Sequence, residues 1–221
     1  MQNQSRILDV GLLKSRLLRQ RILREAFSWD LSQEDAYTLL LSAYEVEVKT
    51  RNRDYVASED ISKYARDIST FLVDKNHRQG LLFLGLPGNG KTTMLLAMQN
   101  ATNLLIWSCQ LKGWEGIRIV HALDVVRAAL SKDGERLQGL IKEPLLAIDD
   151  VGTEPVDVSN YGNIVNPVTE LIERRYENQL FTVISTNLQS SEIRPRYGSR
   201  VADRFNEMFH RVVFENCSFR K

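Results

Sequence analysis

Apolar residues recur at helical spacing along the first part of the chain. Within residues 7–27, apolar side chains pair four positions apart with five basic residues between them, which predicts a helix with a broad apolar surface. Ser32 is followed three residues later by Asp35, as in a capping box. This signature predicts the start of a second helix over 33–48.

A third helix is predicted after a short polar stretch. Ile61 begins an apolar stripe that continues at i+3, i+4, i+7 and i+11, with Ser58 at the N-cap position. This spacing is typical of a helix that packs one side against a core. Residues 49–55, just before it, have the polar character of a linker. We therefore expect a boundary between a small N-terminal helical region (1–57) and a core domain (58–221).

From residue 80 onward the pattern alternates between strands and helices. The run 81–84 is apolar without alternation, as expected of a central parallel strand that is buried on both faces. Residues 104–108 could form a strand, although we favour a helix there. The expected strands are 81–84, 117–120, 145–149, 181–185 and 211–214, and the expected helices are 91–112, 122–131, 135–141, 166–178 and 199–208. The pattern predicts a doubly wound, three-layer α/β domain around a five-stranded parallel sheet.

Composition and charge exclude several classes of protein. The chain has 221 residues, of which 43% are hydrophobic and 26% charged, as in ordinary globular proteins. No apolar run approaches the roughly 18 residues that span a bilayer, and the N-terminus lacks a signal-peptide core, so we expect a cytoplasmic protein without membrane contact. Its two cysteines predict reduced, partly buried thiols and no zinc site.

The net charge of +1 conceals two basic ends. Residues 1–30 hold six Lys or Arg against three acidic residues, and residues 192–221 hold seven against four. The middle of the chain is therefore mildly acidic. This distribution permits a polyanionic partner, but solvated basic faces are equally common.

The most specific motif is a complete GxxxxGK[ST] between a predicted strand and a predicted helix. Its glycines let backbone N–H groups wrap around phosphate oxygens, and the helix N-terminus adds positive potential. Lys91 is placed to reach the β and γ phosphates, and the Thr92 hydroxyl to bind Mg²⁺. The residues expected to bind the nucleotide are Gly85, Pro87, Gly88, Asn89, Gly90, Lys91, Thr92 and Thr93.

A second motif supplies the acids that a P-loop site requires. The apolar strand LLAI ends in Asp149 and Asp150, at the carboxyl edge where open α/β sheets bind ligands. Asp149 is predicted to hold Mg²⁺ directly or through water. Asp150 is predicted to orient and polarise the attacking water. The alternative is an acidic turn that follows a strand.

Polar residues further along the chain extend the predicted site. Asn187 follows the strand FTVIS, where its amide could position water between Asp150 and the γ-phosphate. An ordinary Asx turn is the alternative. Arg200 and Arg204 stand four residues apart on one face of a predicted helix. They either take part in the nucleotide site or are ordinary exposed arginines of an amphipathic helix.

Taken together, these segments resemble a known family. GLPGNGKTT, LLAIDDVGTEP, LIERRYENQLFTVISTNL, SRVADRF and the terminal SFRK are similar to the DnaC/DnaI family of bacterial helicase loaders and the related IstB transposition ATPases, within the AAA+ superfamily. The resemblance covers residues 60–221. It implies an AAA+ core without a helical lid, because few residues follow Asn187.

The resemblance also implies roles for individual residues. Asn187 corresponds to the sensor-1 residue, Arg204 to an arginine finger that acts in trans, and Arg200 to an accessory basic residue. The second acid of the superfamily is commonly Glu, so the shorter Asp150 predicts slow hydrolysis, used as an assembly switch. In helicase loaders the N-terminal region grips the replicative helicase, a role that the apolar surface of residues 7–27 suits as well as self-packing.

The leading hypothesis is therefore an ATP- and Mg²⁺-dependent AAA+ ATPase that loads or remodels a hexameric replicative helicase on single-stranded DNA and self-assembles with ATP bound. An IstB-type helper of a transposase is the alternative. A P-loop small-molecule kinase would leave STNL and SRVADRF without roles, and a GTPase would require an NKxD-type motif, which is missing. A non-catalytic adaptor that uses ATP only for assembly is the fourth possibility.

Overall fold

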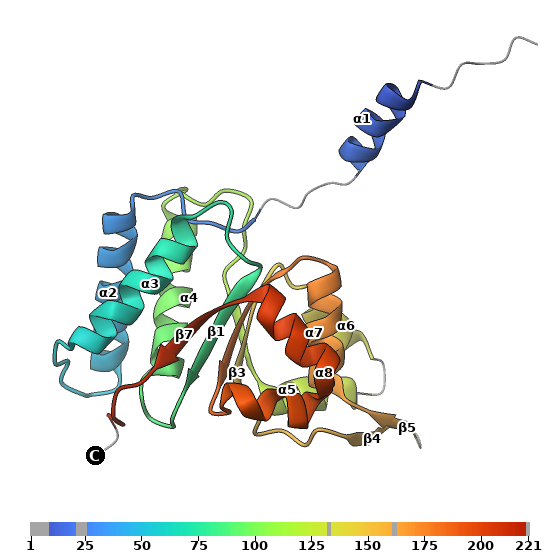
Figure 1. The fold of residues 1–221 in the computed structure, drawn as a ribbon. Coiled ribbons are helices and arrows are strands. Elements are labelled where there is room, and N and C mark those ends of the chain that lie inside the picture. The colour runs from blue at the N-terminus through green and yellow to red at the C-terminus, as the bar shows by residue number, and fades with distance from the viewer. Residues whose placement is uncertain (1–8, 21–25, 132–133, 161–162, 220–221) are drawn as a thin grey trace, which may run out of the picture.

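The core of the molecule is a parallel five-stranded sheet (Figure 1). The computed structural model describes residues 9–20, 26–131, 134–160 and 163–219. In space the strands follow the order β2-β3-β6-β1-β7, and every neighbouring pair is parallel. The strands of this sheet are β1 (Gly80–Gly85), β2 (Arg118–His121), β3 (Leu145–Val151), β6 (Phe181–Thr186) and β7 (Phe209–Phe214).

Helices cover both faces of the sheet, so the domain has three layers (Figure 1). Side chains alternate between the two faces along each strand, so that Leu81 and Phe83 join the core on the side of α2, α3 and α4, while Leu82 and Leu84 join the core on the side of α5 to α8. The described helices are α1 (Val10–Gln20), α2 (Gln33–Thr50), α3 (Glu59–Val73), α4 (Lys91–Trp107), α5 (Ala122–Ala129), α6 (Glu135–Lys142), α7 (Pro167–Glu177) and α8 (Ser190–Met208).

The predicted fold class is confirmed, with differences at the ends of elements. Residues 104–107 are helical, as favoured, but α4 ends at Trp107 rather than near residue 112. α8 starts earlier than expected and is kinked at Gly198, whose φ of 86° breaks the helical run. A short antiparallel hairpin, β4 (Val158–Asn160) with β5 (Asn163–Val165), was not predicted, since three-residue strands show too little periodicity.

The N-terminal helices divide between two locations. α1 is drawn apart from the sheet and its covering helices in Figure 1. The predicted helix over 7–27 extends into residues 21–25, which lie outside the described part of the chain, and Phe27 is buried in non-helical backbone. Phe27 therefore packs in the core and is not on the helix that was predicted to include it.

α2 begins at the predicted capping signal and packs in the core. Ser32 accepts the Asp35 N–H at 3.1 Å. Leu40 and Tyr44 are buried in the same cluster as residues of α3 and α4. Packing is therefore continuous across residue 57, and a cut there would expose this cluster to water.

Two further expectations concern composition. No helix among the described residues is long and apolar enough to cross a membrane. The prediction of partly buried thiols is wrong, because Cys109 and Cys217 are both exposed and free. Cys109 follows the end of α4 with a φ of 59°, and Cys217 lies beyond β7, so both stand outside the helices and strands that form the core.

Candidate active site

The P-loop connects β1 to α4 at the carboxyl edge of the sheet. Gly88 and Gly90 have φ values of 84° and 98°, which side chains rarely tolerate. The loop is also tied to the chain's C-terminal segment: Asn89 Nδ2 donates to the Phe214 carbonyl at 2.8 Å, and the Phe219 N–H donates to the Gly88 carbonyl at 2.9 Å. The end of β7 and the segment that follows it thus hold the P-loop in place.

Lys91 lies at the centre of the site. Its side chain is buried, and its ammonium donates to the carbonyls of Gly85 and Leu86 at 2.7 and 2.9 Å. It also donates to Asn89 Oδ1 at 3.1 Å and to Asn187 Oδ1 at 2.9 Å. The structure therefore brings the predicted sensor residue at the end of β6 into direct contact with the P-loop lysine.

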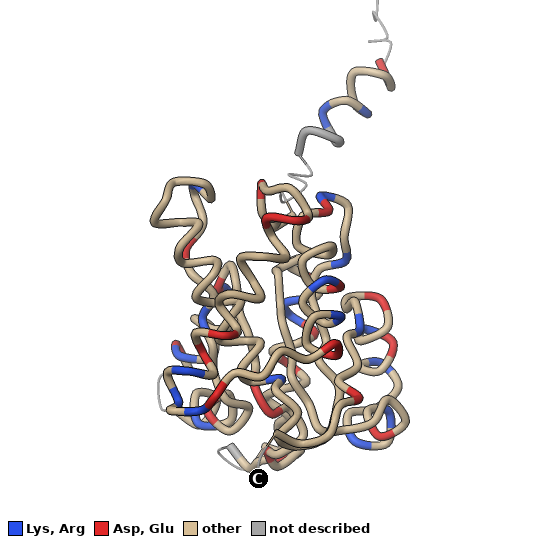
Figure 2. The backbone as a smooth tube through the Cα atoms, turned by 90° about the vertical axis from the view of Figure 1, so that its left-hand side faces the viewer, with Lys and Arg blue, Asp and Glu red and all other residues tan. Residues whose placement is uncertain are grey.

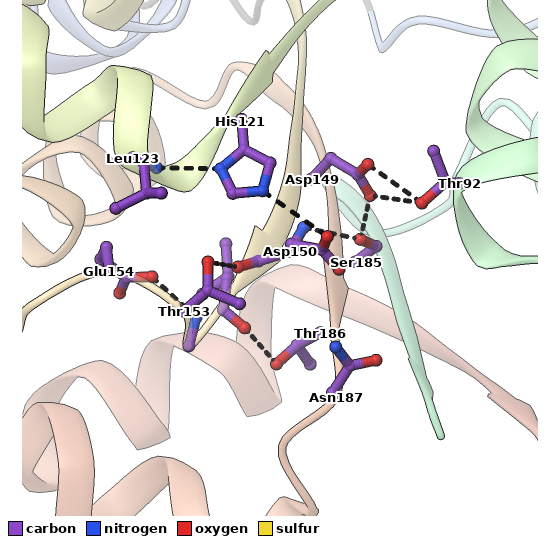
Figure 3. Close-up of polar contacts among 12 residues, drawn as sticks. Thr92, His121, Leu123, Asp149, Asp150, Thr153, Glu154, Ser185, Thr186 and Asn187 are labelled. Carbon is purple, nitrogen blue, oxygen red and sulfur yellow. Dashed lines mark hydrogen bonds and ion pairs between the residues drawn. The ribbon is translucent and has the colours of Figure 1, made fainter. Parts of the chain in front are cut away.

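The two residues predicted to bind the metal face each other. The Thr92 hydroxyl lies 3.0 Å from one Asp149 oxygen and 3.2 Å from the other. Ser185 on the adjacent strand donates its hydroxyl to the same carboxylate (Figure 3). Sequence analysis did not single out Ser185, because its pairing with Asp149 depends on the alignment of β3 with β6.

A bulge in β3 places the second acid. The register between β3 and β6 shifts after Ile148, and Asp150 has a φ of 56°, which Asp and Asn tolerate better than most residues. Its N–H donates to Ser185 Oγ at 2.9 Å instead of continuing the ladder. The bulge separates the two carboxylates, so that Asp149 faces Thr92 while Asp150 lies beside His121 (Figure 3).

His121 is a site residue that the sequence did not reveal. Its Nδ1 accepts the Leu123 N–H at 3.2 Å, so the proton of the neutral ring lies on Nε2. Nε2 is 3.5 Å from Asp150 Oδ2. The only available signal was the position of His121 at the carboxyl end of β2, next to the strand that carries the acids.

The other flank of the P-loop is formed by α2. Arg51 Nη1 donates to Thr93 Oγ1 at 2.9 Å. A Cβ added to Gly90 would come within 2.6 Å of the Tyr44 hydroxyl. Burial raises the pKa of Tyr44 to about 12, so it remains a neutral phenol over the physiological range. The end of α2 therefore belongs to the surroundings of the site.

The loop after Asp150 is anchored by a buried carboxylate. Glu154 is 2% exposed and accepts the Gly152 N–H at 2.8 Å as well as the Tyr197 hydroxyl. Burial, together with the hydrogen bond to Glu154, raises the pKa of Tyr197, which keeps its hydroxyl a donor. These contacts tie α8 to the loop that leaves the site.

Arg200 and Arg204 have different surroundings. Arg200 pairs with Glu173 at 2.9 Å, and Arg204 lies 3.4 Å from Glu207. The Arg204 guanidinium also stacks on the Tyr176 ring, 4.0 Å from its centroid. The contacts found for these arginines in the described part of the chain are with α7 and α8, and none is with the P-loop of the same chain.

The residues present fit a nucleotide phosphate chain with Mg²⁺. Gly90 provides no side-chain cap for α4, so the N–H groups of the first turn can serve phosphate oxygens. Thr92 and Asp149 offer the oxygen ligands that Mg²⁺ prefers, and such sites are completed by water and phosphate.

The sheet order, the P-loop and the two acids define the fold of an AAA+ P-loop protein. Among solved structures, the chain is similar to the DnaC helicase loader at 26% identity and a TM-score of 0.53, covering 72% of this chain and 92% of that chain. It is similar to DnaI at 18% identity and a TM-score of 0.53, covering 72% and 87%. The predicted resemblance to helicase loaders is thus confirmed at the level of structure.

A third similar structure is AMPPCP-bound DnaA from Aquifex aeolicus, at 17% identity and a TM-score of 0.51. The match covers 72% of this chain and 48% of that one, so the chain corresponds to about half of DnaA. The chain matches no protein-family model and no curated protein. At this identity the DnaA likeness describes the fold.

Proposed function

We propose that this protein binds and hydrolyses ATP and loads or remodels a replicative DNA helicase on single-stranded DNA. The observation that carries the proposal is the likeness to the DnaC helicase loader, which extends over 92% of that chain at 26% identity. The contacts among Lys91, Asn187, Thr92 and Asp149 support the ATPase part of the proposal.

In this proposal each side chain has a distinct task. Lys91 and the N-terminus of α4 bind the β and γ phosphates. Thr92 and Asp149 would hold Mg²⁺, which neutralises phosphate charge when bound. Asp150 accepts a proton from the attacking water, and Asn187, beside the Lys91 ammonium, orients that water.

Asp150→Asn tests the proton acceptor. Asparagine tolerates the φ of 56° and keeps the backbone N–H that donates to Ser185, so the loop should keep its shape. We expect Mg²⁺-ATP binding to change little while hydrolysis falls by about 10² or more, the range of a lost general base. Single-turnover hydrolysis and nucleotide titration measure the two effects separately, and an unchanged rate would move this role to another group.

The DNA-binding part of the proposal rests on phosphate contacts by basic side chains. In the view of Figure 2, basic and acidic residues are interspersed over the body of the molecule. The arginines of α8 follow this pattern, since Arg194 pairs with Asp203 and Arg200 with Glu173. We propose that single-stranded DNA competes for Arg200 in an ATP-bound assembly, in which several chains combine their contacts.

We also propose that the N-terminal region grips the helicase. Because α2 packs in the core, we assign this role to α1, whose Val10, Leu12 and Leu13 are exposed by 69%, 53% and 39%. Exposed apolar side chains on a helix fit the apolar groove of a partner.

Leu13→Glu in the full chain should therefore weaken helicase binding by about tenfold or more, because a buried apolar contact is replaced by a charge. Ser15→Glu, which adds the same charge to α1, is the matched control and should have a smaller effect. Co-purification titrations with the host's replicative helicase measure both. Equal affinities for the two variants would assign the grip to another surface.

The decisive test of the whole function is a loading assay. The full chain, the host's hexameric helicase, ATP and a DNA circle that has no free end are combined, and helicase retained on the circle is measured. ATP-dependent retention supports the proposal. Absence of helicase binding together with capture of a transposase would favour the transposition helper.

A further inference from the structure

Arg204 is held on an aromatic platform by residues of two helices. α7 and α8 lie side by side (Figure 1). The Arg204 guanidinium lies 4.0 Å from the centroid of the Tyr176 ring on α7, and its Nη1 is 3.4 Å from Glu207 Oε2. The Tyr176 hydroxyl donates to the same Glu207 carboxylate. Each of these three side chains therefore contacts the other two.

This set distinguishes Arg204 from Arg194 and Arg200 on the same helix, whereas Arg196 is also partly covered, by Tyr197 and Glu154. The Arg204 side chain is 28% exposed, whereas Arg194 and Arg200 are 61% and 65% exposed and contact acidic residues only through ion pairs. An exposed pair leaves a long arginine free to change rotamer. A ring beneath the guanidinium limits its movement to one plane, and the in-plane N–H groups can still donate.

Tyr176 stays a hydrogen-bond donor in this arrangement. Its hydrogen bond to Glu207 raises the pKa of the phenol, and the nearby Arg204 charge only partly opposes that effect. The Glu207 carboxylate therefore accepts hydrogen bonds from both the Tyr176 hydroxyl and the Arg204 guanidinium. The contacts fix the side chain before any neighbouring molecule is present.

We propose that Tyr176, with Glu207, is a positioning residue that holds Arg204 in the orientation needed at the γ-phosphate of a neighbouring subunit. This inference rests on the proposed ATPase function and on the trans role that the resemblance to helicase loaders implies for Arg204. Pre-organisation matters there because an arginine that must be ordered during each turnover contributes less to the transition state. In this arrangement Tyr176 contacts the Arg204 guanidinium and the Glu207 carboxylate, and it acts through Arg204.

The test uses mixed assemblies, in which the position of Tyr176 can be chosen. Lys91→Ala and Arg204→Ala chains are each expected to be inactive, whereas their mixture should contain sites with Lys91 from one chain and Arg204 from the other. Tyr176→Leu is then added to one chain or to the other. When Tyr176→Leu is added to the Lys91→Ala chain, which supplies Arg204, the recovered ATPase activity should fall by roughly ten- to a hundred-fold.

In the Arg204→Ala chain the same Tyr176→Leu substitution should change the recovered activity less than about twofold, because that chain supplies no arginine. Tyr176→Phe keeps the ring and should retain most of the activity in either chain. Tyr37→Leu is the matched control, since it removes another Arg–Tyr stack, in which Arg66 lies 4.1 Å from the Tyr37 ring centroid. Any change that Tyr37→Leu causes in the recovered ATPase activity should be the same in either chain.

The outcomes separate this inference from the proposal beneath it. Losses of equal size in both chains, or no loss in either, would overturn the positioning role of Tyr176. An inactive parental mixture, in chains shown by cross-linking to co-assemble, would overturn the shared site itself. Thermal unfolding of each variant verifies that the fold is intact.

Discussion

Lys91→Ala should lose ATP binding, with an affinity at least about a hundredfold below that of the parent chain. The ammonium is the cation that we propose to lie against the β and γ phosphates, and hydrogen bonds from charged groups contribute roughly 1.5–3 kcal/mol each. Lys91 is also buried and donates to Gly85, Leu86, Asn89 and Asn187, so its removal takes away an internal tie of the P-loop. A fluorescent nucleotide titration measures the affinity.

Metal-free conditions provide a matched control for Lys91. Asp149 faces Thr92 and is proposed to act through Mg²⁺, so Asp149→Asn should bind nucleotide as the parent does when EDTA is present. Lys91→Ala should remain weak under the same conditions, because its contact with phosphate needs no metal. Parent-like affinity of Lys91→Ala in EDTA would show that the lysine does not hold the phosphates.

Local motifs were enough to predict the central part of the site. Lys91 and Thr92 are placed by a strand, a glycine-rich turn and a helix that follow one another in sequence. Asp149 and Asn187 were predicted because each stands at the carboxyl end of a buried strand, and parallel strands bring their carboxyl ends to one edge. The hydrogen bond between Lys91 and Asn187 agrees with that reasoning.

The parts of the site that the sequence did not predict depend on long-range packing. Ser185 meets Asp149, and Phe219 meets Gly88, only because strands distant in sequence are neighbours in the sheet. The bulge at Asp150 is likewise set by pairing between β3 and β6, which a single strand does not encode.

The polar composition of residues 49–55 suggested a linker, but composition does not show where α2 packs. The buried Leu40 and Tyr44 of α2 would look the same in the sequence if α2 belonged to a separate domain with its own core.

Arg204→Ala should bind ATP almost normally but lose hydrolysis by about 10³ or more, the effect of removing an arginine finger. The contacts described for Arg204 are with Tyr176 and Glu207, and Thr92 and Lys91 of the same chain are tied to other partners. The substitution should therefore leave the chain's own phosphate site intact. A slow parent rate reduces the loss that can be measured, so single-turnover conditions are needed.

Arg194→Ala is the matched control for this loss. Arg194 lies on the same helix, is 61% exposed and pairs with Asp203 at 3.1 Å, so its removal changes the charge of α8 by the same amount. Its hydrolysis rate should stay within about threefold of the parent, because exposed pairs contribute little. A loss of similar size in both variants would mean that α8 needs positive charge in general, without a specific role for Arg204.

The concentration dependence of hydrolysis tests whether Arg204 completes a site that is shared between chains. If Lys91 and Arg204 of different chains form one site, the parent's rate per chain should rise with protein concentration until assembly saturates. The Arg204→Ala rate should stay low over the same range, although its ATP affinity is retained. A parent rate per chain that is independent of concentration, in a protein shown by sedimentation to remain monomeric, would place the complete site within one chain and return Arg204 to a structural role on α8.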